Sequence, residues 1–151
     1  MLNFRQATVD DSQLVLDYIK KLAKYEKLED EVTGTVDDVI ANIFEREVAK
    51  VLIISDNDNN NVGFSLYFHN FSTFQVKPGL YIEDLYIDEQ YRGLGYGTQV
   101  FEYYKHLAKE QGCGRIEWIC LDWNESAIDF YENKIGATPM SGWTIRRLTI
   151  A

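Results

Sequence analysis

A strand-like segment that runs directly into a glycine-rich turn and then a helix-like segment is the strongest constraint on the fold of this chain. Residues 79–88, GLYIEDLYID, have the apolar and alternating pattern that is typical of a strand. The next residues, EQYRGLGYGTQ, place glycines at positions 93, 95 and 97. Helical spacing follows, up to Gly112, at Val100, Phe101, Tyr104, Leu107 and Ala108. The pattern predicts a helix that begins at a glycine-rich turn immediately after a strand.

The other segments predict strands that are joined partly by hairpins and partly by helices. Helix patterns begin after Asp10 or Asp11, near Thr35, and at residue 124, where the helix runs to Gly136. Strand patterns cover residues 2–7, 49–55, 61–71 and 115–121, and a closing hairpin is expected from 137–140 and 143–150. The sequence therefore predicts an α/β fold over residues 1–151 as a single domain. We expect a mixed, mostly antiparallel central sheet of about seven strands flanked by about four helices.

Composition excludes several classes of function. The chain carries 24 Asp and Glu against 15 Lys and Arg, whereas a protein that binds nucleic-acid phosphates needs a basic excess, so we expect no nucleic-acid partner. No apolar run approaches the roughly 18 residues of a membrane span. The N-terminus lacks a signal-peptide pattern, so we expect a cytoplasmic protein with no membrane partner. Cys113 and Cys120 lack a CxxC arrangement, and we predict no metal site.

A strand followed by glycines and a helix is one way in which proteins bind a diphosphate. Backbone N–H groups converge on the phosphate oxygens at the helix N-terminus, and glycine permits the close approach. The spacing does not fit a Rossmann GxGxxG motif, because Thr98 and Val100 stand where the third glycine is required. A Walker A motif is also missing. From the spacing alone, a glycine turn without a ligand is an equally good interpretation.

The residues around this turn resemble a known family. QYRGLGYGTQ resembles the acyl-coenzyme A pyrophosphate loop of the GNAT superfamily of N-acetyltransferases, and LDWNESAIDFYENKIGA resembles the superfamily's second coenzyme A segment. LAKYEKLEDEV, GLYIEDLYI and the GW before the last strand narrow the resemblance to the diamine acetyltransferases, which include spermidine/spermine and thialysine acetyltransferases. The resemblance implies the GNAT acyl-CoA N-acyltransferase fold and acetyl-CoA as the co-substrate. It covers most of the chain, but residues 35–62 carry no shared motif.

The resemblance assigns roles in cofactor binding and proton donation. The main chain of the strand before the turn is expected to hold the pantetheine arm and to polarise the acetyl carbonyl. Tyr131 matches the family's proposed general acid, and a phenol with a pKa near ~10 is protonated at neutral pH. The predicted cofactor-binding residues are Leu85, Tyr86, Ile87, Arg92, Gly93, Leu94, Gly95, Tyr96, Gly97, Thr98 and Asn124.

Four residues are predicted to contact the acceptor amine. By resemblance, Glu83 takes the amine proton through water, Glu26 holds the distal ammonium group of the acceptor, and Tyr25 lines the same channel. Asp84 is the fourth. Because Glu83 and Asp84 are neighbours on a strand, their side chains point to opposite faces unless a bulge intervenes.

The resemblance predicts acetyl transfer to a primary amine of a small cationic acceptor, by direct attack in a ternary complex. Neither coenzyme A motif contains a cysteine that could carry the acetyl group. One alternative keeps the fold but changes the acceptor to an amino acid, an antibiotic or a protein amine. Another alternative is a non-catalytic acyl-CoA-binding module. The family also implies a homodimer.

Overall fold

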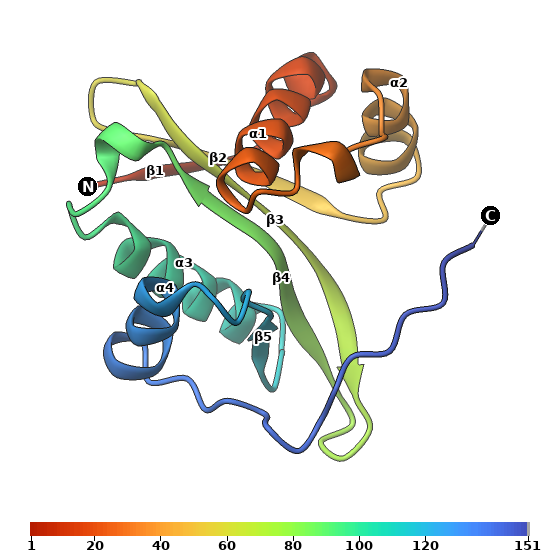
Figure 1. The fold of residues 1–151 in the computed structure, drawn as a ribbon, viewed down its shortest axis with the longest axis vertical. Helices are drawn as coiled ribbons and strands as arrows, with labels where there is room; N and C mark the ends of the chain where they lie inside the picture. The colour runs from red at the N-terminus through yellow and green to blue at the C-terminus, as the bar shows by residue number, and fades with distance from the viewer. Residues whose placement is uncertain (151) are drawn as a thin grey trace. The chain divides into compact units, whose positions relative to one another are not determined.

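The first part of the chain is built on a five-stranded sheet with the strand order β1-β2-β3-β4-β5 (Figure 1). We describe residues 1–150 of a computed structural model, in which the chain divides into two compact units, Met1–Ile119 and Cys120–Ala151. The sheet belongs to the first unit. Neighbouring strands are antiparallel except for β4 and β5, which are parallel. The strands are β1 (Asn3–Gln6), β2 (Lys50–Ser55), β3 (Asn61–Ser72), β4 (Lys77–Ile87) and β5 (Ile116–Trp118).

Helices cover both faces of this sheet. Helix α1 (Ser12–Tyr25) and helix α2 (Val36–Val39), which continues as a π-helical turn over Ile40–Glu45, share one buried cluster with β2 and β3. Helix α3 (Tyr96–Glu110) lies against β4 and β5. Alternation along β3 separates the two faces. Phe64 stacks on Tyr18 of α1 with ring centroids 5.3 Å apart, and the next residue, Ser65, accepts a hydrogen bond from Tyr104 of α3.

Aromatic side chains dominate the face covered by α3. Phe101 and Tyr104 are almost completely buried, and full burial of such a side chain contributes about 1.5–3 kcal/mol. Phe101 also packs against Trp118 of β5, with ring centroids 4.7 Å apart. At the opposite end of the sheet, Phe4 of β1 stacks on Tyr103 at 4.4 Å. These contacts fix α3, and therefore the turn that precedes it, relative to the sheet.

The helix starts follow the signals in the sequence. Helix α1 has Asp11 as its N-cap residue, as predicted. Helix α2 begins with a capping box: the Thr35 amide donates to the Asp38 carboxylate at 2.8 Å, and the Asp38 amide donates to Thr35 Oγ1 at 3.3 Å. Helix α3 has Gly95 as its N-cap, in a left-handed conformation with φ of 78°. The hairpin of β2 and β3 also forms as predicted.

The second unit contains helix α4 (Glu125–Asp129), which continues as a π-helical turn, Phe130–Lys134. Its N-cap is Asn124, whose side chain accepts a hydrogen bond from the Ala127 amide at 3.3 Å. Gly136 follows with a φ of 82°, as expected of a residue that stops a helix. The prediction that residues 1–151 form a single domain stays a prediction.

The fold class is confirmed, but the number of strands is smaller than predicted. The expected closing hairpin is wrong for the described residues: residues 137–150 contain no strand, and their only regular feature is a turn in which the Trp143 amide donates to the Met140 carbonyl. The predicted strand at 115–121 is also shortened to Ile116–Trp118. An apolar, alternating pattern specifies an extended backbone, but a strand also needs a hydrogen-bonded neighbour, and the pattern cannot supply that neighbour.

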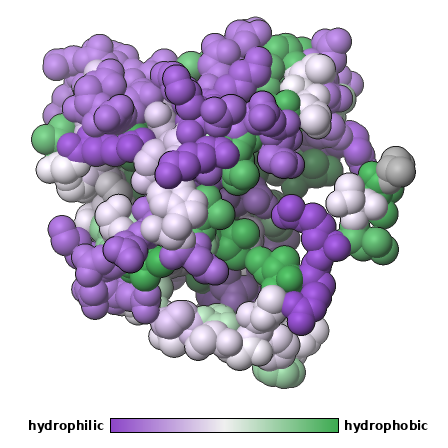
Figure 2. All heavy atoms as spheres, viewed as in Figure 1, coloured by the Kyte–Doolittle hydropathy of each residue, from purple (hydrophilic) through white to green (hydrophobic). Residues whose placement is uncertain are grey.

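The surface is largely hydrophilic on the face seen in Figure 2, in keeping with a net charge of −9. Within residues 1–150, none of the helices combines the length and the apolar composition needed to cross a membrane.

Candidate active site

The glycine-rich turn forms an open loop at the start of α3. Gly93 and Gly95 both have positive φ, 79° and 78°, and a Cβ atom added at either would meet nothing within 4 Å. Gly95 has no side chain, so it leaves the first amides of the helix without a side-chain cap. An uncapped helix N-terminus with open space in front of it can accept an anion. The residues present therefore fit a diphosphate group.

The strand before this loop offers a second set of backbone groups. Strand β5 pairs with β4 only from Leu80 to Ile82, so β4 continues for five more residues without that neighbour, as far as Ile87. On its other side this segment pairs with β3. The edge from Glu83 to Ile87, which includes the predicted residues Leu85, Tyr86 and Ile87, is therefore available for hydrogen bonds to an extended ligand. It leads directly into the glycine loop.

Arg92 connects the loop to the end of α1. Its Nε atom donates to the Ile87 carbonyl at 2.9 Å. Its guanidinium carbon lies 4.5 Å from the ring centroid of Tyr25 and 5.2 Å from that of Tyr86. Tyr25 was predicted from the sequence to belong to the acceptor channel, and Arg92 to the cofactor loop. The structure places the two residues in contact.

A β-bulge lies in β4 at the two acidic residues. Asp84 pairs with Leu66 of β3, and Ile82 pairs with the next residue, Tyr67. Glu83 is therefore an extra residue in β4. A bulge breaks the alternation of side chains and re-aims one of them, which is the exception that the sequence analysis allowed for.

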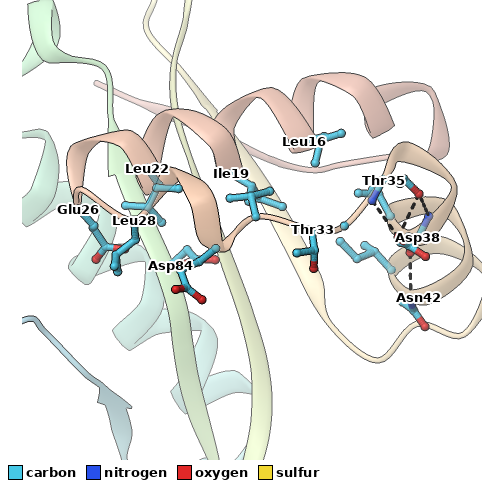
Figure 3. Close-up of a pocket in the computed structure, with 16 residues that line it drawn as sticks. Leu16, Ile19, Leu22, Glu26, Leu28, Thr33, Thr35, Asp38, Asn42 and Asp84 are labelled. Carbon is cyan, nitrogen blue, oxygen red and sulfur yellow. Dashed lines mark hydrogen bonds between the residues drawn. The ribbon is translucent and has the colours of Figure 1, made fainter. Parts of the chain in front are cut away.

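A cavity of about 470 Å³ opens beside this bulge (Figure 3). The carboxylates of Glu26 and Asp84 lie toward one end of it, and the capping residues Thr35 and Asp38 lie at the other. Apolar side chains, including Ile19, lie between the two ends. The full lining comprises Leu16, Ile19, Leu22, Ala23, Glu26, Leu28, Glu31, Val32, Thr33, Gly34, Thr35, Asp38, Val39, Asn42, Ile43 and Asp84. This set includes four carboxylates and no Lys, Arg or His.

Burial and neighbouring negative charge raise the pKa of two carboxyl groups at one end of the cavity. Burial, followed by the neighbouring charges of Glu83 and Glu26, raises the pKa of Asp84 to about 7. Burial and the charge of Glu83 also raise the pKa of Glu26 above its ordinary value. At the other end of the cavity, hydrogen bonds from Thr35 lower the pKa of Asp38. The end of the cavity near the bulge therefore combines negative charge with a carboxyl group that can exchange a proton near neutral pH.

The sequence analysis did not identify the cavity wall formed by residues 28–42. Glu31 and Asp38 lie there, in a segment that overlaps the region without a shared motif. Glu31 lies in LAKYEKLEDEV, which resembles the diamine acetyltransferases, but the resemblance gave Glu31 no role. Thr35 was interpreted only as a helix start, and Asp38 was not singled out.

Leu94 lies in the glycine loop, and Tyr96, Gly97 and Thr98 form the first turn of α3. Two other predicted residues lie in the second unit. Asn124 caps α4 as described, and its Oδ1 atom also accepts from Ser126 Oγ at 3.3 Å. Tyr131 is partly buried in the π-helical turn, with its ring centroid 5.5 Å from that of Phe130. Its carbonyl accepts a hydrogen bond from the Ala137 amide at 2.9 Å. Helical turns of this type occur often at functional sites.

Comparisons of sequence agree with this geometry. The family model described as "Acetyltransferase (GNAT) family" matches residues 16–137. L-ornithine N5-acetyltransferase NATA1 of Arabidopsis thaliana is 43% identical over 93 residues, which are 62% of this chain and 40% of that protein. The chain thus spans less than half the length of that relative. Thialysine N-epsilon-acetyltransferase of Bos taurus is 32% identical over 150 residues, covering 92% of this chain and 87% of that protein.

A solved structure shows the same fold. A tetramutant of the BH1408 protein from Bacillus halodurans superposes with a TM-score of 0.77 at 25% identity, over 98% of this chain and 99% of that one. The family model covers most of this chain, and it includes both the glycine loop and the bulged strand. The chain therefore belongs to the acetyltransferase (GNAT) family and is an acetyl-CoA-dependent N-acetyltransferase.

Proposed function

We propose that this enzyme acetylates a primary amine of a small diamine or polyamine, by direct attack of the amine on acetyl-CoA in a ternary complex. The observation that carries the proposal is the cavity beside the bulge of β4. It combines carboxylates with an apolar middle, and a diamine combines ammonium groups with a methylene chain.

The absence of basic residues from the cavity lining favours acceptors without a carboxylate. The relatives named above act, by their names, on ornithine and thialysine, which are amino acids. An α-carboxylate in this cavity would meet carboxylates and no Lys, Arg or His side chain. Such like-charge contacts are unfavourable, whereas a second ammonium group would be stabilised.

The predicted cofactor-binding and catalytic residues then have roles in the proposal. The loop from Arg92 to Thr98 holds the diphosphate of acetyl-CoA, and the exposed edge of β4 holds its pantetheine arm and polarises the thioester carbonyl. Asn124 contacts coenzyme A, as the resemblance implies. Tyr131 donates a proton to the departing thiolate, and a carboxylate of the Glu83–Asp84 pair receives the proton of the acceptor ammonium.

A panel of amines tests the proposal. Release of coenzyme A is measured as free thiol with 1,3-diaminopropane, spermidine, ornithine, thialysine and a lysine-containing peptide. Reactions without amine correct for the thiols of Cys113 and Cys120. We expect kcat/KM for the two carboxylate-free amines to exceed that for ornithine by at least about 10-fold. A preference for ornithine or the peptide would contradict the proposed acceptor class. Binding of acetyl-CoA without release by any amine would favour a non-catalytic module.

We also propose that the enzyme is a cytoplasmic homodimer. Four large apolar side chains of the C-terminal segment are 62% to 87% exposed, which suits contact with a second copy: Trp143, Ile145, Leu148 and Ile150. Sedimentation velocity at micromolar concentration is expected to give the mass of two chains for the wild type and of one chain for the double variant Ile145→Asp/Leu148→Asp. A monomeric wild-type protein would contradict this proposal.

A further inference from the structure

Asp88 joins β4 to the turn that leads into the glycine loop. It follows directly after β4 and is the N-cap residue of a single 3-10 turn, Glu89–Tyr91. Its amide donates to the Val62 carbonyl of β3 at 2.8 Å, and its carbonyl accepts from the Tyr91 amide at 2.9 Å. The backbone of Asp88 is therefore bonded to the sheet on one side and to the turn on the other, and its position sets where the glycine loop leaves the sheet.

The side chain of Asp88 does not cap this turn. An aspartate at an N-cap position commonly accepts a hydrogen bond from an amide of the first turn, but Asp88 makes no such bond. Its carboxylate contacts α1 instead. Oδ2 accepts a hydrogen bond from Tyr18 Oη at 3.2 Å, and Oδ1 accepts one from Lys21 Nζ at 3.1 Å. Both oxygens of the residue that opens the loop are thus bonded to the same helix.

This contact is buried and its charge is balanced. Asp88 is 7% exposed, and a carboxylate is rarely buried to this extent unless it is paired. Lys21 supplies the opposite charge. Tyr18, which is almost completely buried, supplies the second donor. Burial, and then the charge of Asp88, raise the pKa of Tyr18, so its hydroxyl stays protonated and can donate.

Arg92 makes a second contact between the loop and α1. Asp88 contacts the middle of the helix, whereas the guanidinium of Arg92 lies over the ring of Tyr25, the last residue of the helix. The segment from Asp88 to Arg92 is therefore held against α1 at both ends. Gly95, the N-cap of α3, follows three residues later. The uncapped amides at the start of α3 thus have a defined position relative to α1.

We propose that Asp88 is a positioning residue for acetyl-CoA, because its bonds to Tyr18 and Lys21 hold the glycine loop in the arrangement that binds the diphosphate. Asp88 acts through the backbone of the loop and does not touch the cofactor. This inference rests on the proposed role of the glycine loop. It adds three residues to which the sequence and the resemblance gave no part in binding.

The expected effect on affinity follows from the population of the arrangement that binds. When a ligand binds only one arrangement of a loop, its apparent affinity falls with the fraction of molecules in that arrangement. Without the side-chain bonds of Asp88, the junction keeps only its backbone bonds and the contact of Arg92, so this fraction decreases. Bound acetyl-CoA restores the arrangement. The loss therefore falls on binding and not on the chemical step at saturation.

Three variants and a matched control test the proposal. Asp88→Ala removes both bonds, Asp88→Asn keeps the shape of the side chain without its charge, and Tyr18→Phe removes one donor and keeps the ring. The control is Asp11→Ala. The Asp11 carboxylate, at the start of α1, accepts two hydrogen bonds from Arg5 of β1 at 2.8 and 2.9 Å, so it also holds α1 but has no contact with the loop.

The dissociation constant for acetyl-CoA is measured by titration calorimetry, kcat and KM by thiol release with the best amine of the panel, and folding by thermal melting. We expect the dissociation constant to rise at least about 10-fold in Asp88→Ala and about 3-fold in Tyr18→Phe, with Asp88→Asn between the wild type and Asp88→Ala. At saturating acetyl-CoA, kcat should stay within about threefold in all three variants. Asp11→Ala should bind acetyl-CoA within about twofold of the wild type, even where its melting temperature falls as far.

Several results would overturn the inference. One is an unchanged dissociation constant in folded Asp88→Ala; if that variant does not fold, unchanged constants in both Asp88→Asn and Tyr18→Phe decide in the same way. Equal weakening in Asp11→Ala would show a general loosening of α1. A fall in kcat as large as the rise in KM would place the effect on the chemical step. A wild-type protein that does not bind acetyl-CoA would instead refute the role of the loop itself, and that result requires no variant.

Discussion

Replacement of Tyr131 by Phe is expected to lower kcat about 100-fold and to leave the dissociation constant for acetyl-CoA within about twofold. The substitution removes only the phenolic oxygen and keeps the ring beside Phe130. If Tyr131 supplies the proton to the departing thiolate, the loss falls on the chemical step and not on binding. The two quantities are measured by thiol release at saturating amine and by titration calorimetry.

Tyr103→Phe is the matched control for Tyr131→Phe. Tyr103 is a partly buried tyrosine of α3 that stacks on Phe4, away from the glycine loop and the cavity. The same single-atom deletion there should leave kcat within about twofold. Parallel losses of kcat and acetyl-CoA affinity in Tyr131→Phe would argue for a structural role of the hydroxyl and against proton donation.

Asp84→Asn is expected to make the protein more stable at pH 8 than the wild type. The native pKa of Asp84 is raised to about 7 from an ordinary value of 3.8, mainly by burial. Above pH 7 the wild type must hold a charged, partly buried carboxylate, and the amide removes that cost. The size of the gain follows from the size of the pKa shift, at 1.36 kcal/mol per pKa unit. Because the side chain is partly exposed to solvent, we expect a reduced gain of roughly 2–4 kcal/mol.

The pH dependence fixes the sign of this prediction. Between about pH 4 and pH 7 the native state holds the Asp84 proton more tightly than the unfolded state does, so the free energy of unfolding falls as pH rises. Urea unfolding of both proteins at pH 5 and pH 8 should therefore show a small difference at pH 5 and the full gain at pH 8. A variant less stable than the wild type at pH 8 would mean that the Asp84 carboxylate is stabilised as an anion.

Local signals in the sequence predicted most of the first unit. The Thr35 cap, the β2–β3 hairpin and the glycine N-cap of α3 depend on residues close together in the chain, and all three are present. The closing strands at 137–140 and 143–150 depend on a distant hydrogen-bonding neighbour, and they are not formed in the described residues. The hydrophobic pattern of a segment specifies its backbone conformation better than it specifies the strand with which the segment pairs.

In the candidate active site, too, features formed by residues close together in the chain were predicted, and features formed by distant contacts were not. The glycine loop is contiguous in the sequence and was identified from it, whereas the cavity wall at residues 28–42 depends on how α1, α2 and β4 meet. The bulge at Glu83 is a register shift against Leu66 and Tyr67 of another strand, so no property of β4 alone specifies it. The roles of the site residues remain predictions, and the variants described above test them.

Titration calorimetry with acetyl-CoA on Gly95→Ala and Gly112→Ala tests the central claim most directly. Both glycines have positive φ, 78° and 71°, and both face open space, but Gly95 begins α3 in the proposed diphosphate loop and Gly112 follows the other end of the same helix. Each alanine should cost about 1–2 kcal/mol of stability through backbone strain. We predict submillimolar binding to the wild type and to Gly112→Ala, and at least about 10-fold weaker binding to Gly95→Ala. No binding to the folded wild-type protein, or equal affinities for the two variants, would contradict the assignment of this loop as the acetyl-CoA site.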